Sequence, residues 1–373
     1  MRAIDSKLPE EISKVIEPNS MSGSDGYEVS SFRSLVELVA KTAYLNKDSL
    51  LFFRGQNTDY INKVGKSTFY PGIYRGDYLK QREINYRFDL LSGACQLLVK
   101  RFEDANITST ADLRKRKLIQ WSILQHYEVC LTPLLDFTQS LRVAASFAQL
   151  NNTGEFSYVY VFGMPYLTNR ISYNSEHELV NIRLLSICPP EALRPYFQEG
   201  YLACTEDIEN SYDSKSDLDF NNRLIAKFRI LNAEKFWGNG FHAIPKNALY
   251  PKKDKIQGIC SEIMDEVKKG LHPGQIGEFL KGWNMIELFL NQQTAFGRQS
   301  RSVLEGIWTL RENPMITNQL IYQVDSLRRF RNQLVHSPTD TDQVKVRDNM
   351  ILLDEVLMRI NQIKVIESIK SKS

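Results

Sequence analysis

The last third of the chain shows a single kind of pattern, in which apolar residues recur every three or four positions. Strand-like alternation disappears after residues 250–254, a Tyr-Pro-Lys-Lys-Asp segment typical of a domain boundary. Apolar stripes at helical spacing predict amphipathic helices, and several in succession predict a bundle. Three stripes follow: Ile256, Ile259, Ile263 and Val267; Ile276, Phe279, Leu280, Trp283, Ile286 and Leu290; and Val346, Met350, Leu353, Leu357, Ile360 and Ile363.

The segment before this boundary mixes helical and strand-like patterns. Residues 83–101 have helical spacing, whereas 156–162 is rich in β-forming residues and 223–230 alternates as a half-buried strand does. These patterns predict an α+β domain, with helices on a mixed sheet, over residues 30–255. An all-α helical-bundle domain is expected over residues 256–373.

The first 29 residues look different from the rest. Residues 19–26 are small and polar and have little to bury, so we expect residues 1–29 to form a flexible segment. The first packed helix should begin after Ser30 and Ser31, which are suitable N-cap residues.

Charge and cysteine usage limit the class of protein. The 373 residues include 47 basic and 44 acidic ones, a net charge of +3 that permits nucleic acid as a partner without arguing for it. The five cysteines are scattered without metal-ligand spacing, so we expect free thiols in a reducing compartment and no metal site. The chain shows neither a signal peptide nor an apolar run of about 18 residues. We therefore expect a cytoplasmic protein with no membrane association.

One helix of the bundle carries an arginine on its apolar side. This helix should begin near Asn318, and its apolar seam consists of Leu320, Val324, Leu327 and Leu334. Arg331 lies four residues after Leu327 and three before Leu334, so it falls on the seam. Because an unpaired buried charge is costly, Arg331 needs an acid, an interface or an anionic ligand as its partner.

The end of the same helix carries a histidine. His336 lies four residues after Asn332, so these two side chains share a face. Arg331 and His336 are about 140° apart on an ideal helix, so they meet one substrate atom only if the last turn distorts or two copies face each other in a symmetric dimer. Such a cleft suits RNA cleavage without a metal, because histidine transfers protons at the 2′-hydroxyl or 5′-oxygen and arginine neutralises the charge on the phosphorus oxygens.

The segment Arg331-Asn332-Gln333-Leu334-Val335-His336 resembles the R-x-x-x-x-H motif of the HEPN family, and the likeness extends over residues 256–373. The resemblance implies a metal-independent endoribonuclease that needs no cofactor and acts as a homodimer on RNA such as tRNA. Arg331 and His336 would be catalytic and Asn332 supporting. It also implies a toxin or anti-phage role, with an antitoxin or regulator as partner. A helix C-terminus that favours nearby basic residues explains the same pattern without catalysis.

Separate motifs in the first domain occur in one order. They are Phe53-Arg54-Gly55-Gln56; Tyr70-Pro71-Gly72-Ile73-Tyr74-Arg75; Gln125-His126-Tyr127; Leu134-Leu135-Asp136-Phe137-Thr138 with Ala144-Ala145-Ser146-Phe147-Ala148; Arg194 with Gln198-Glu199-Gly200; and Leu249-Tyr250-Pro251. Together they resemble the FRG domain over roughly residues 30–255, which implies a sensing or regulatory domain. Glu128 stands where that family usually has glycine, and Phe137 replaces the commoner tryptophan.

Part of this pattern also resembles the R-S-E class of ADP-ribosyltransferases, which implies NAD as a cofactor. In that class an arginine holds the dinucleotide, hydroxyls support the nicotinamide site, and a glutamate stabilises the ribose cation; Arg54, Thr138 and Glu199 are the candidates. The full set of candidate nucleotide-binding residues is Arg54, Gly55, Gln56, Asp136, Thr138, Ser140 and Glu199. Alternatively, Arg54 and Asp136 form a buried ion pair that fixes two loops.

The sequence thus leaves three hypotheses. The first is a HEPN-type ribonuclease with an FRG-like regulatory domain. The second is an NAD-binding or ADP-ribosyltransferase-like FRG domain, with the helical domain as its dimerisation module. In the third, both domains bind partners and neither is catalytic.

Overall fold

The computed structural model describes residues 1–76, 79, 81–206, 208, 214–238, 240–269, 273–293, 303–336 and 343–370. Contacts divide the chain into two compact units, Met1–Met264 and Asp265–Ser373. This division falls inside helix α10 (Lys255–Lys269), whereas the sequence predicted a boundary between residues 255 and 256. The buried residues Ile256, Cys260 and Ile263 show why: the first part of α10 packs within the first unit.

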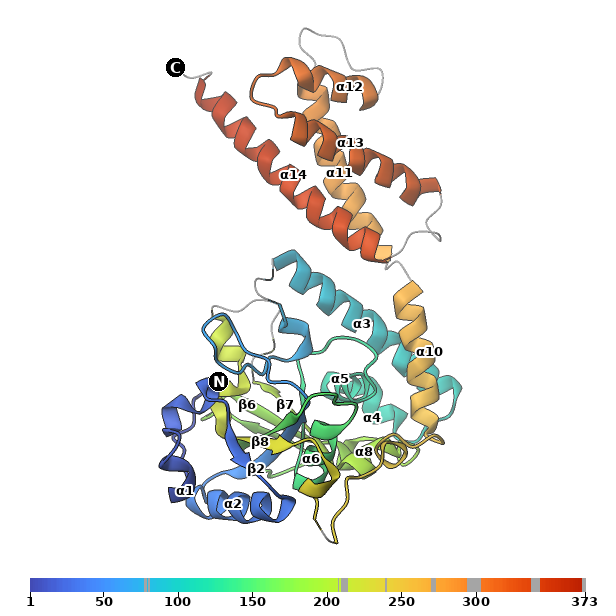
Figure 1. The fold of residues 1–373 in the computed structure, drawn as a ribbon. Coiled ribbons are helices and arrows are strands. Elements are labelled where there is room, and N and C mark those ends of the chain that lie inside the picture. The colour runs from blue at the N-terminus through green and yellow to red at the C-terminus, as the bar shows by residue number, and fades with distance from the viewer. Residues whose placement is uncertain are drawn as a thin grey trace. The chain divides into compact units, whose positions relative to one another are not determined.

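An eight-stranded mixed sheet forms the centre of the first unit (Figure 1). Its order is β1-β8-β4-β2-β3-β7-β6-β5, and every neighbouring pair is antiparallel except β1 with β8. The strands are β1 (Tyr27–Val29), β2 (Leu50–Gln56), β3 (Leu135–Thr138), β4 (Phe156–Met164), β5 (Ile171–Asn174), β6 (Leu179–Arg183), β7 (Gly200–Thr205) and β8 (Leu224–Leu231). The α+β class and the mixed sheet predicted from the sequence are confirmed.

Helices and short 3-10 turns surround this sheet. The helices are α1 (Glu10–Ser13), α2 (Phe32–Leu45), α3 (Gln81–Asp104), α4 (Thr110–Lys115), α5 (Lys117–His126), α6 (Leu141–Gln149), α7 (Leu184–Ile187), α8 (Arg194–Gln198) and α9 (Lys246–Leu249). The 3-10 turns are η1 (Pro18–Gly23), η2 (Gly72–Tyr74), η3 (Lys215–Leu218), η4 (Phe220–Arg223) and η5 (Glu234–Phe236). Helix α2 begins where the sequence predicted, because the Ser31 hydroxyl accepts a hydrogen bond from the backbone N–H of Ser34.

Residues 1–29, which composition predicted to be flexible, pack onto the sheet in the structure. Ile12 and Met21 are buried in the main core, and β1 pairs with β8. The small polar stretch forms most of η1 and the turn after it. A few apolar side chains fix this segment although its overall composition is polar.

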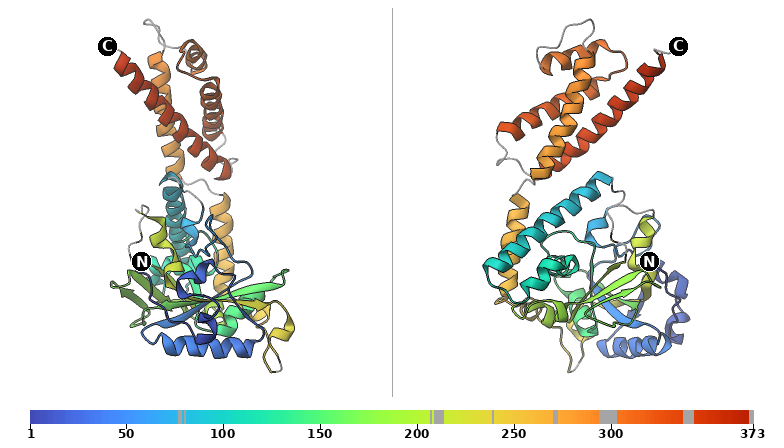
Figure 2. Two further views of the ribbon diagram at one scale, coloured as in Figure 1. Left: turned by 60° about the vertical axis from the view of Figure 1, so that its left-hand side comes forward. Right: turned by 180° about the vertical axis from the view of Figure 1, so that it is seen from behind.

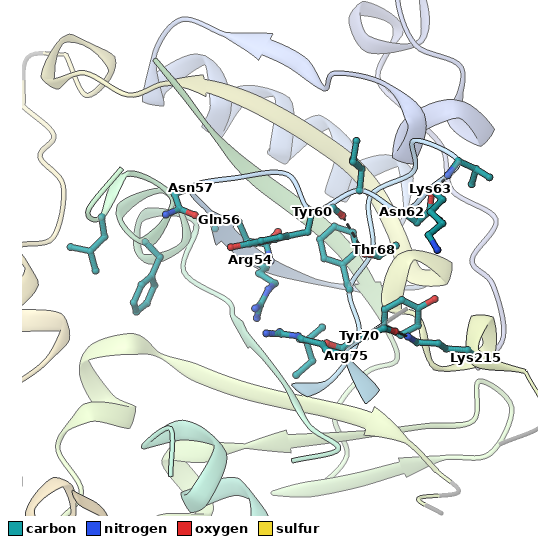
Figure 3. A pocket seen from close by; sticks show the side chains of 18 residues that line it. Arg54, Gln56, Asn57, Tyr60, Asn62, Lys63, Thr68, Tyr70, Arg75 and Lys215 are labelled. Carbon is teal, nitrogen blue, oxygen red and sulfur yellow. Dashed lines mark hydrogen bonds between the residues drawn. The ribbon is translucent and has the colours of Figure 1, made fainter. Parts of the chain in front are cut away.

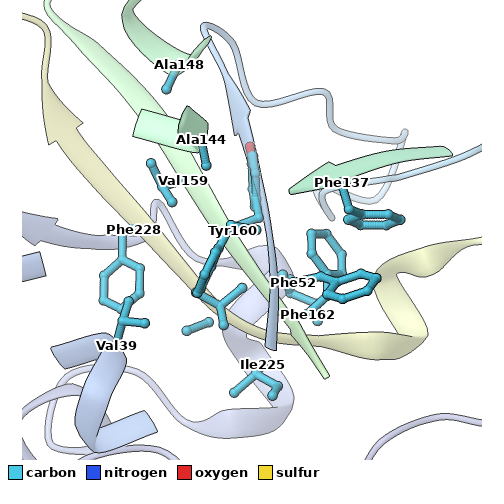
Figure 4. Packing of buried hydrophobic residues seen from close by; sticks show 14 of the residues in the cluster. Val39, Phe52, Phe137, Ala144, Ala148, Val159, Tyr160, Phe162, Ile225 and Phe228 are labelled. Atoms are coloured by element: carbon cyan, nitrogen blue, oxygen red, sulfur yellow. The ribbon is translucent and has the colours of Figure 1, made fainter. Parts of the chain in front are cut away.

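Helix α6 crosses strand β2 at very close range. A Cβ atom added at Gly55 would lie 1.8 Å from the carbonyl oxygen of Ala144 and 2.8 Å from the backbone nitrogen of Ala148. Ala144 and Ala148 are themselves fully buried, and Figure 4 shows both beside Val159 of β4. The glycine of the Phe-Arg-Gly motif and the alanines of α6 therefore form a single contact, because only small residues allow the backbones of β2 and α6 to lie so close together.

Alternation along β2 separates the packing residue from its polar neighbour. Successive side chains of a strand point to opposite faces, so Arg54 faces away from the side on which α6 contacts Gly55. Arg54 pairs with Tyr160 of β4, and Tyr160 pairs with Lys227 of β8. Directly paired residues share a face, so these three side chains form a polar row across the sheet.

The second unit is helical in its described part. It contains α11 (Pro273–Gln293), α12 (Val303–Thr309), the 3-10 turn η6 (Leu310–Glu312), α13 (Asn318–His336) and α14 (Gln343–Lys370), and Figure 2 shows the long helices packed together. The predicted seam of α13 is buried throughout: Leu320, Val324, Leu327 and Leu334. The all-α character of this part of the chain is confirmed.

Two findings bear on the chemical environment of the chain. All five cysteines are free thiols, as their scattered positions predicted. None of the described helices is both long and apolar enough to cross a membrane.

Gly55→Ala is expected to destabilise the first unit by about 3 kcal/mol or more, because the new methyl group collides with a backbone oxygen that moves only if α6 moves. Denaturant unfolding measures the change. The matched control is Gly258→Ala in α10, where an added Cβ meets nothing within 4 Å and the helix gains about 0.4–1 kcal/mol. Equal stability of wild type and Gly55→Ala would contradict the close approach of α6 to β2.

Candidate functional site

The Phe-Arg-Gly arginine lies where β2 and β3 meet. Phe53 pairs with Thr138 across these strands, which brings Arg54 beside Asp136. Nη1 of Arg54 donates a hydrogen bond of 2.6 Å to the backbone carbonyl oxygen of Asp136, while the Asp136 carboxylate turns toward α5. The ion pair that the sequence offered as an alternative is thus replaced by a bond to the backbone, and the carboxylate remains available for other groups.

Arg54 lines a cavity of about 780 Å³, which we call the cationic pocket. Its basic lining residues are Arg54, Lys63, Arg75 and Lys215, and its aromatic ones are Tyr60, Phe69, Tyr70 and Phe147. None of the described lining residues is an aspartate or a glutamate. In Figure 3 the guanidinium groups of Arg54 and Arg75 point toward one another. The cavity therefore concentrates positive charge without a carboxylate on its described wall.

The Arg54 guanidinium titrates below the usual range of an arginine. Burial lowers the pKa of Arg54 to about 10; the charge of Asp136 opposes this shift and the charge of Arg75 adds to it. The guanidinium nevertheless stays protonated at neutral pH. Its Nε atom is buried and has no hydrogen-bond partner within the described part of the chain. A desolvated cation with an unused donor, next to a second arginine, is stabilised by an anion.

A buried network fixes the loop that supplies much of this pocket. The Asp59 carboxylate accepts a 2.6 Å hydrogen bond from Nζ of Lys227 and a 2.9 Å bond from the hydroxyl of Tyr160. Lys227 is 1% exposed and also donates to Ser67. Lys227 and Tyr160 of the polar row therefore fix the loop of residues 59–67 at both ends, through Asp59 and Ser67. Tyr60, at the start of this loop, lines the pocket.

A second, smaller cavity of about 180 Å³ adjoins the first, and we call it the carboxylate pocket. The two cavities share Arg54, Gly55 and Phe147 as lining residues. Further residues that line the carboxylate pocket are Gln125, His126, Glu128, Asp136, Thr138, Arg194, Gln198 and Tyr250. Most of the separated sequence motifs therefore meet around Arg54, although they come from distant parts of the chain.

Asp136 is the central anion of the carboxylate pocket. Its Oδ2 accepts a 2.6 Å hydrogen bond from Nε2 of Gln125, and its Oδ1 lies 3.8 Å from Nδ1 of His126. Partial burial by itself would raise the pKa of Asp136, but His126, Arg54 and Gln125 together outweigh it and lower that pKa. Asp136 is therefore ionised at neutral pH.

His126 is almost completely buried beside this carboxylate. Its side chain is 3% exposed, and burial lowers the pKa of His126 more strongly than the neighbouring Asp136 raises it. Its Nε2 atom is buried without a hydrogen-bond partner among the described residues. Gly200 leaves room for the ring, since a Cβ there would approach Cε1 of His126 to 3.3 Å. His126 is thus held neutral at pH 7.

The other wall of the carboxylate pocket is built on a buried arginine. Nη2 of Arg194 pairs with Oε1 of Glu128 at 2.5 Å, and the guanidinium lies 4.5 Å from the ring centre of Tyr250. Glu128 has a φ of +58°, a left-handed conformation that favours glycine, which agrees with the glycine usual in FRG domains at this position. The departure noted in the sequence therefore keeps the loop conformation and adds a carboxylate.

Asp254 positions this wall. Its Oδ2 accepts hydrogen bonds from the backbone N–H groups of Leu193 and Arg194 and from the hydroxyl of Tyr127, and its Oδ1 caps α10 through the N–H groups of Ile256 and Gln257. Asp254, which the sequence placed at the domain boundary, is therefore a buried residue that connects the site to the start of α10 through hydrogen bonds.

The structure brings most of the predicted nucleotide-binding residues together. Arg54, Gly55 and Gln56 line the cationic pocket, and Asp136 and Thr138 line the carboxylate pocket. Two others lie elsewhere, and this corrects their predicted roles.

Ser140 is the N-cap of α6, where its hydroxyl accepts from the N–H of Val143. Glu199 is exposed at the left-handed C-cap of α8, with a φ of +44°, and lines neither pocket. A hydroxyl ahead of a helix and an acid before a glycine are also cap and turn signals, which the sequence did not separate from chemistry.

Sequence reasoning did not select several residues that the structure places in the site. Arg75 is the last residue of the Tyr70–Arg75 motif, and its basic side chain could have marked it as a candidate ligand-binding residue. Lys215 lies in η3, far along the chain, and no motif marks it. Arg194 and Tyr250 belonged to recognised segments but had no assigned role.

The candidate catalytic segment of the second unit lies at the end of α13. Arg331 is partly buried, and its Nη1 lies 3.2 Å from Oδ1 of Asn332. Its Nε is buried and has no partner among the described residues. Helix α13 ends at His336, of which the structure describes only the backbone. The His336 side chain, Ser337 and Pro338 lie outside the described part of the chain. The joint action of Arg331 and His336 stays a prediction.

Comparison with known proteins supports one of the three resemblances. The family model of the FRG domain matches residues 49–155, a span that includes Arg54, Arg75, His126 and Asp136. The likeness to the FRG domain is therefore confirmed for residues 49–155. No curated protein and no solved structure matches the chain. The likeness of the helical unit to the HEPN family stays a prediction.

The buried His126 should make stability fall as the medium becomes acidic. In the unfolded chain His126 takes up a proton near pH 6.5, whereas in the folded protein its lowered pKa delays protonation. The unfolded state then binds more protons, so the free energy of unfolding decreases below about pH 6.5. His126→Gln is expected to lose less stability than wild type between pH 7 and pH 5, as measured by denaturant unfolding at each pH.

The exposed His242 provides the control. His242→Gln should follow the wild-type pH dependence, since this residue is exposed and lies outside the buried cluster around Asp136. Identical pH dependence in wild type and His126→Gln would show that burial does not shift the titration of His126.

Proposed function

We propose that the FRG-containing unit is a binding module for a nucleotide, whose phosphates occupy the cationic pocket. The observation that supports this most is the charge of that pocket: four basic residues and no acidic one among its described lining residues. The facing guanidinium groups of Arg54 and Arg75 add geometric support. Arginine forms paired hydrogen bonds with phosphate as with carboxylate, and four basic residues in one cavity favour a ligand with several negative charges, such as the phosphates of a nucleotide.

The size and walls of the pocket favour a nucleotide over inorganic phosphate. Its volume of about 780 Å³ lies within the range of ordinary small-molecule sites. Phe147, which lines both the cationic pocket and the carboxylate pocket, offers an aromatic face on which a base stacks. Glu199 lies outside both pockets, so the geometry favours nucleotide binding over the transferase chemistry that required this glutamate.

Arg75→Ala is expected to weaken binding of ATP, or of inorganic pyrophosphate, by tenfold or more, because one charge-assisted phosphate contact is lost. Isothermal titration calorimetry measures both ligands. Arg33→Ala, which removes an exposed arginine on α2, is the control and should bind as wild type does. Arg75 is itself exposed, so the variant should fold normally. Unchanged affinity in Arg75→Ala would contradict the proposed phosphate site.

As a second candidate function we propose that the helical unit is a metal-independent, homodimeric endoribonuclease of HEPN type, regulated by the FRG domain. Its support is the position of Arg331 between the buried Leu327 and Leu334, with an Nε atom that no described residue satisfies. Such an arginine suits an anion or a second copy of the chain. By the family resemblance, His336 supplies proton transfer and Asn332 orients Arg331.

The ribonuclease proposal predicts cleavage of tRNA or total RNA by the purified protein in the presence of EDTA. Arg331→Ala and His336→Ala should each abolish it, because one removes charge neutralisation and the other proton transfer. The control is Arg329→Ala, which removes a neighbouring, largely exposed arginine paired with Asp325. Cleavage that is absent from wild type, or equal in all four proteins, rules out this activity.

A further inference from the structure

We infer that the nucleotide spans both cavities, with its phosphates in the cationic pocket and the hydroxyls of its ribose bound to Asp136 in the carboxylate pocket. This inference rests on the proposed nucleotide binding and adds the class of nucleotide: one with a ribose diol, as opposed to a sugar without these hydroxyls.

The two cavities are contiguous at one side chain. Arg54 lines both, and its Nη1 is hydrogen-bonded to the backbone oxygen of Asp136. A ligand whose phosphate contacts the guanidinium of Arg54 therefore has its next group within reach of Asp136. In a nucleotide the group that follows the phosphates is the sugar.

The Asp136 carboxylate has unused capacity to accept hydrogen bonds. An ionised carboxylate offers about four acceptor positions, and Gln125 uses one of them. Nδ1 of His126 lies 3.8 Å from Oδ1, beyond a direct hydrogen bond. The Asp136 side chain is 40% exposed although His126 beside it is buried, so the carboxylate is open to a ligand. Acidic side chains bind ribose hydroxyls in this way in dinucleotide-binding folds.

The neighbours of Asp136 hold it in an orientation that suits hydroxyl groups. The hydroxyl of Thr132 donates to Oε1 of Gln125, which fixes the amide so that its Nε2 faces Asp136. Thr132 is fully buried and also accepts from the N–H of Leu134. The carboxylate is therefore preorganised, and little rotational freedom is lost when a ligand binds.

Size and charge assign the sugar and the phosphates to different cavities. A volume of about 180 Å³ corresponds to about six water molecules, which suits a sugar ring better than a base with phosphates. Asp136 would repel a phosphate, whereas hydroxyl groups donate to it without such a penalty. The cationic pocket, in contrast, has no acid among its described lining residues.

The test compares the four ribonucleoside triphosphates with their 2′,3′-dideoxy counterparts by calorimetry on the full chain. We expect at least one ribonucleotide to bind about tenfold more tightly than its dideoxy form, because each lost hydroxyl removes a hydrogen bond to a charged group. In Asp136→Asn this preference should shrink to less than about threefold. Asp104→Asn, which removes an exposed carboxylate at the end of α3, should keep the wild-type preference.

The outcomes separate this inference from the function on which it rests. Equal binding of ribo and dideoxy forms to wild type, with Arg75→Ala still defective, overturns the ribose assignment and leaves the phosphate site intact. Absence of binding by every nucleotide overturns both. The wild-type comparison decides the matter even if Asp136→Asn fails to fold.

Discussion

The close contact between Gly55 and the backbone of α6 determines the geometry of the whole site. Because no side chain separates β2 from Ala144 and Ala148, α6 packs directly on the strand and brings Phe147 to both cavities. The same register sends Arg54 to the opposite face, in line with Tyr160 and Lys227. One packing constraint therefore places the arginine, the aromatic wall and the anchored loop relative to one another.

The distribution of charge around Arg54 determines which ligands this site favours. Positive charge collects on one side of Arg54, where Arg75 and Lys215 line the larger cavity, and ionised Asp136 lies on the other side. Arg54 is bonded to a carbonyl oxygen, and the nearby charge of Asp136 only partly offsets the cost of desolvating the guanidinium. Charged groups with strongly shifted pKa values cluster at functional sites, where a ligand of opposite charge neutralises them. The adjacent carboxylate extends recognition from phosphate to a hydrogen-bond donor.

Much of this was present in the sequence, and the missing part has physical reasons. The fold class and the helical second unit followed from periodicity, and the grouping of Arg54, Gly55, Gln56, Asp136 and Thr138 was implied by family resemblance. The roles of Ser140 and Glu199 did not, because caps and turns use the same residue types as active sites. The position of Lys215 in the pocket and the pairing of Asp59 with Lys227 both depend on the three-dimensional fold of distant segments, which local sequence patterns do not encode.

The central claim is that an anion binds between Arg54 and Arg75. Its most direct test is a crystal structure of the protein soaked with tungstate, located by anomalous scattering. The account predicts a peak within hydrogen-bond distance of the guanidinium groups of Arg54 and Arg75. Tungstate bound at other surfaces, with the space between these two arginines unoccupied at the same concentration, would contradict it.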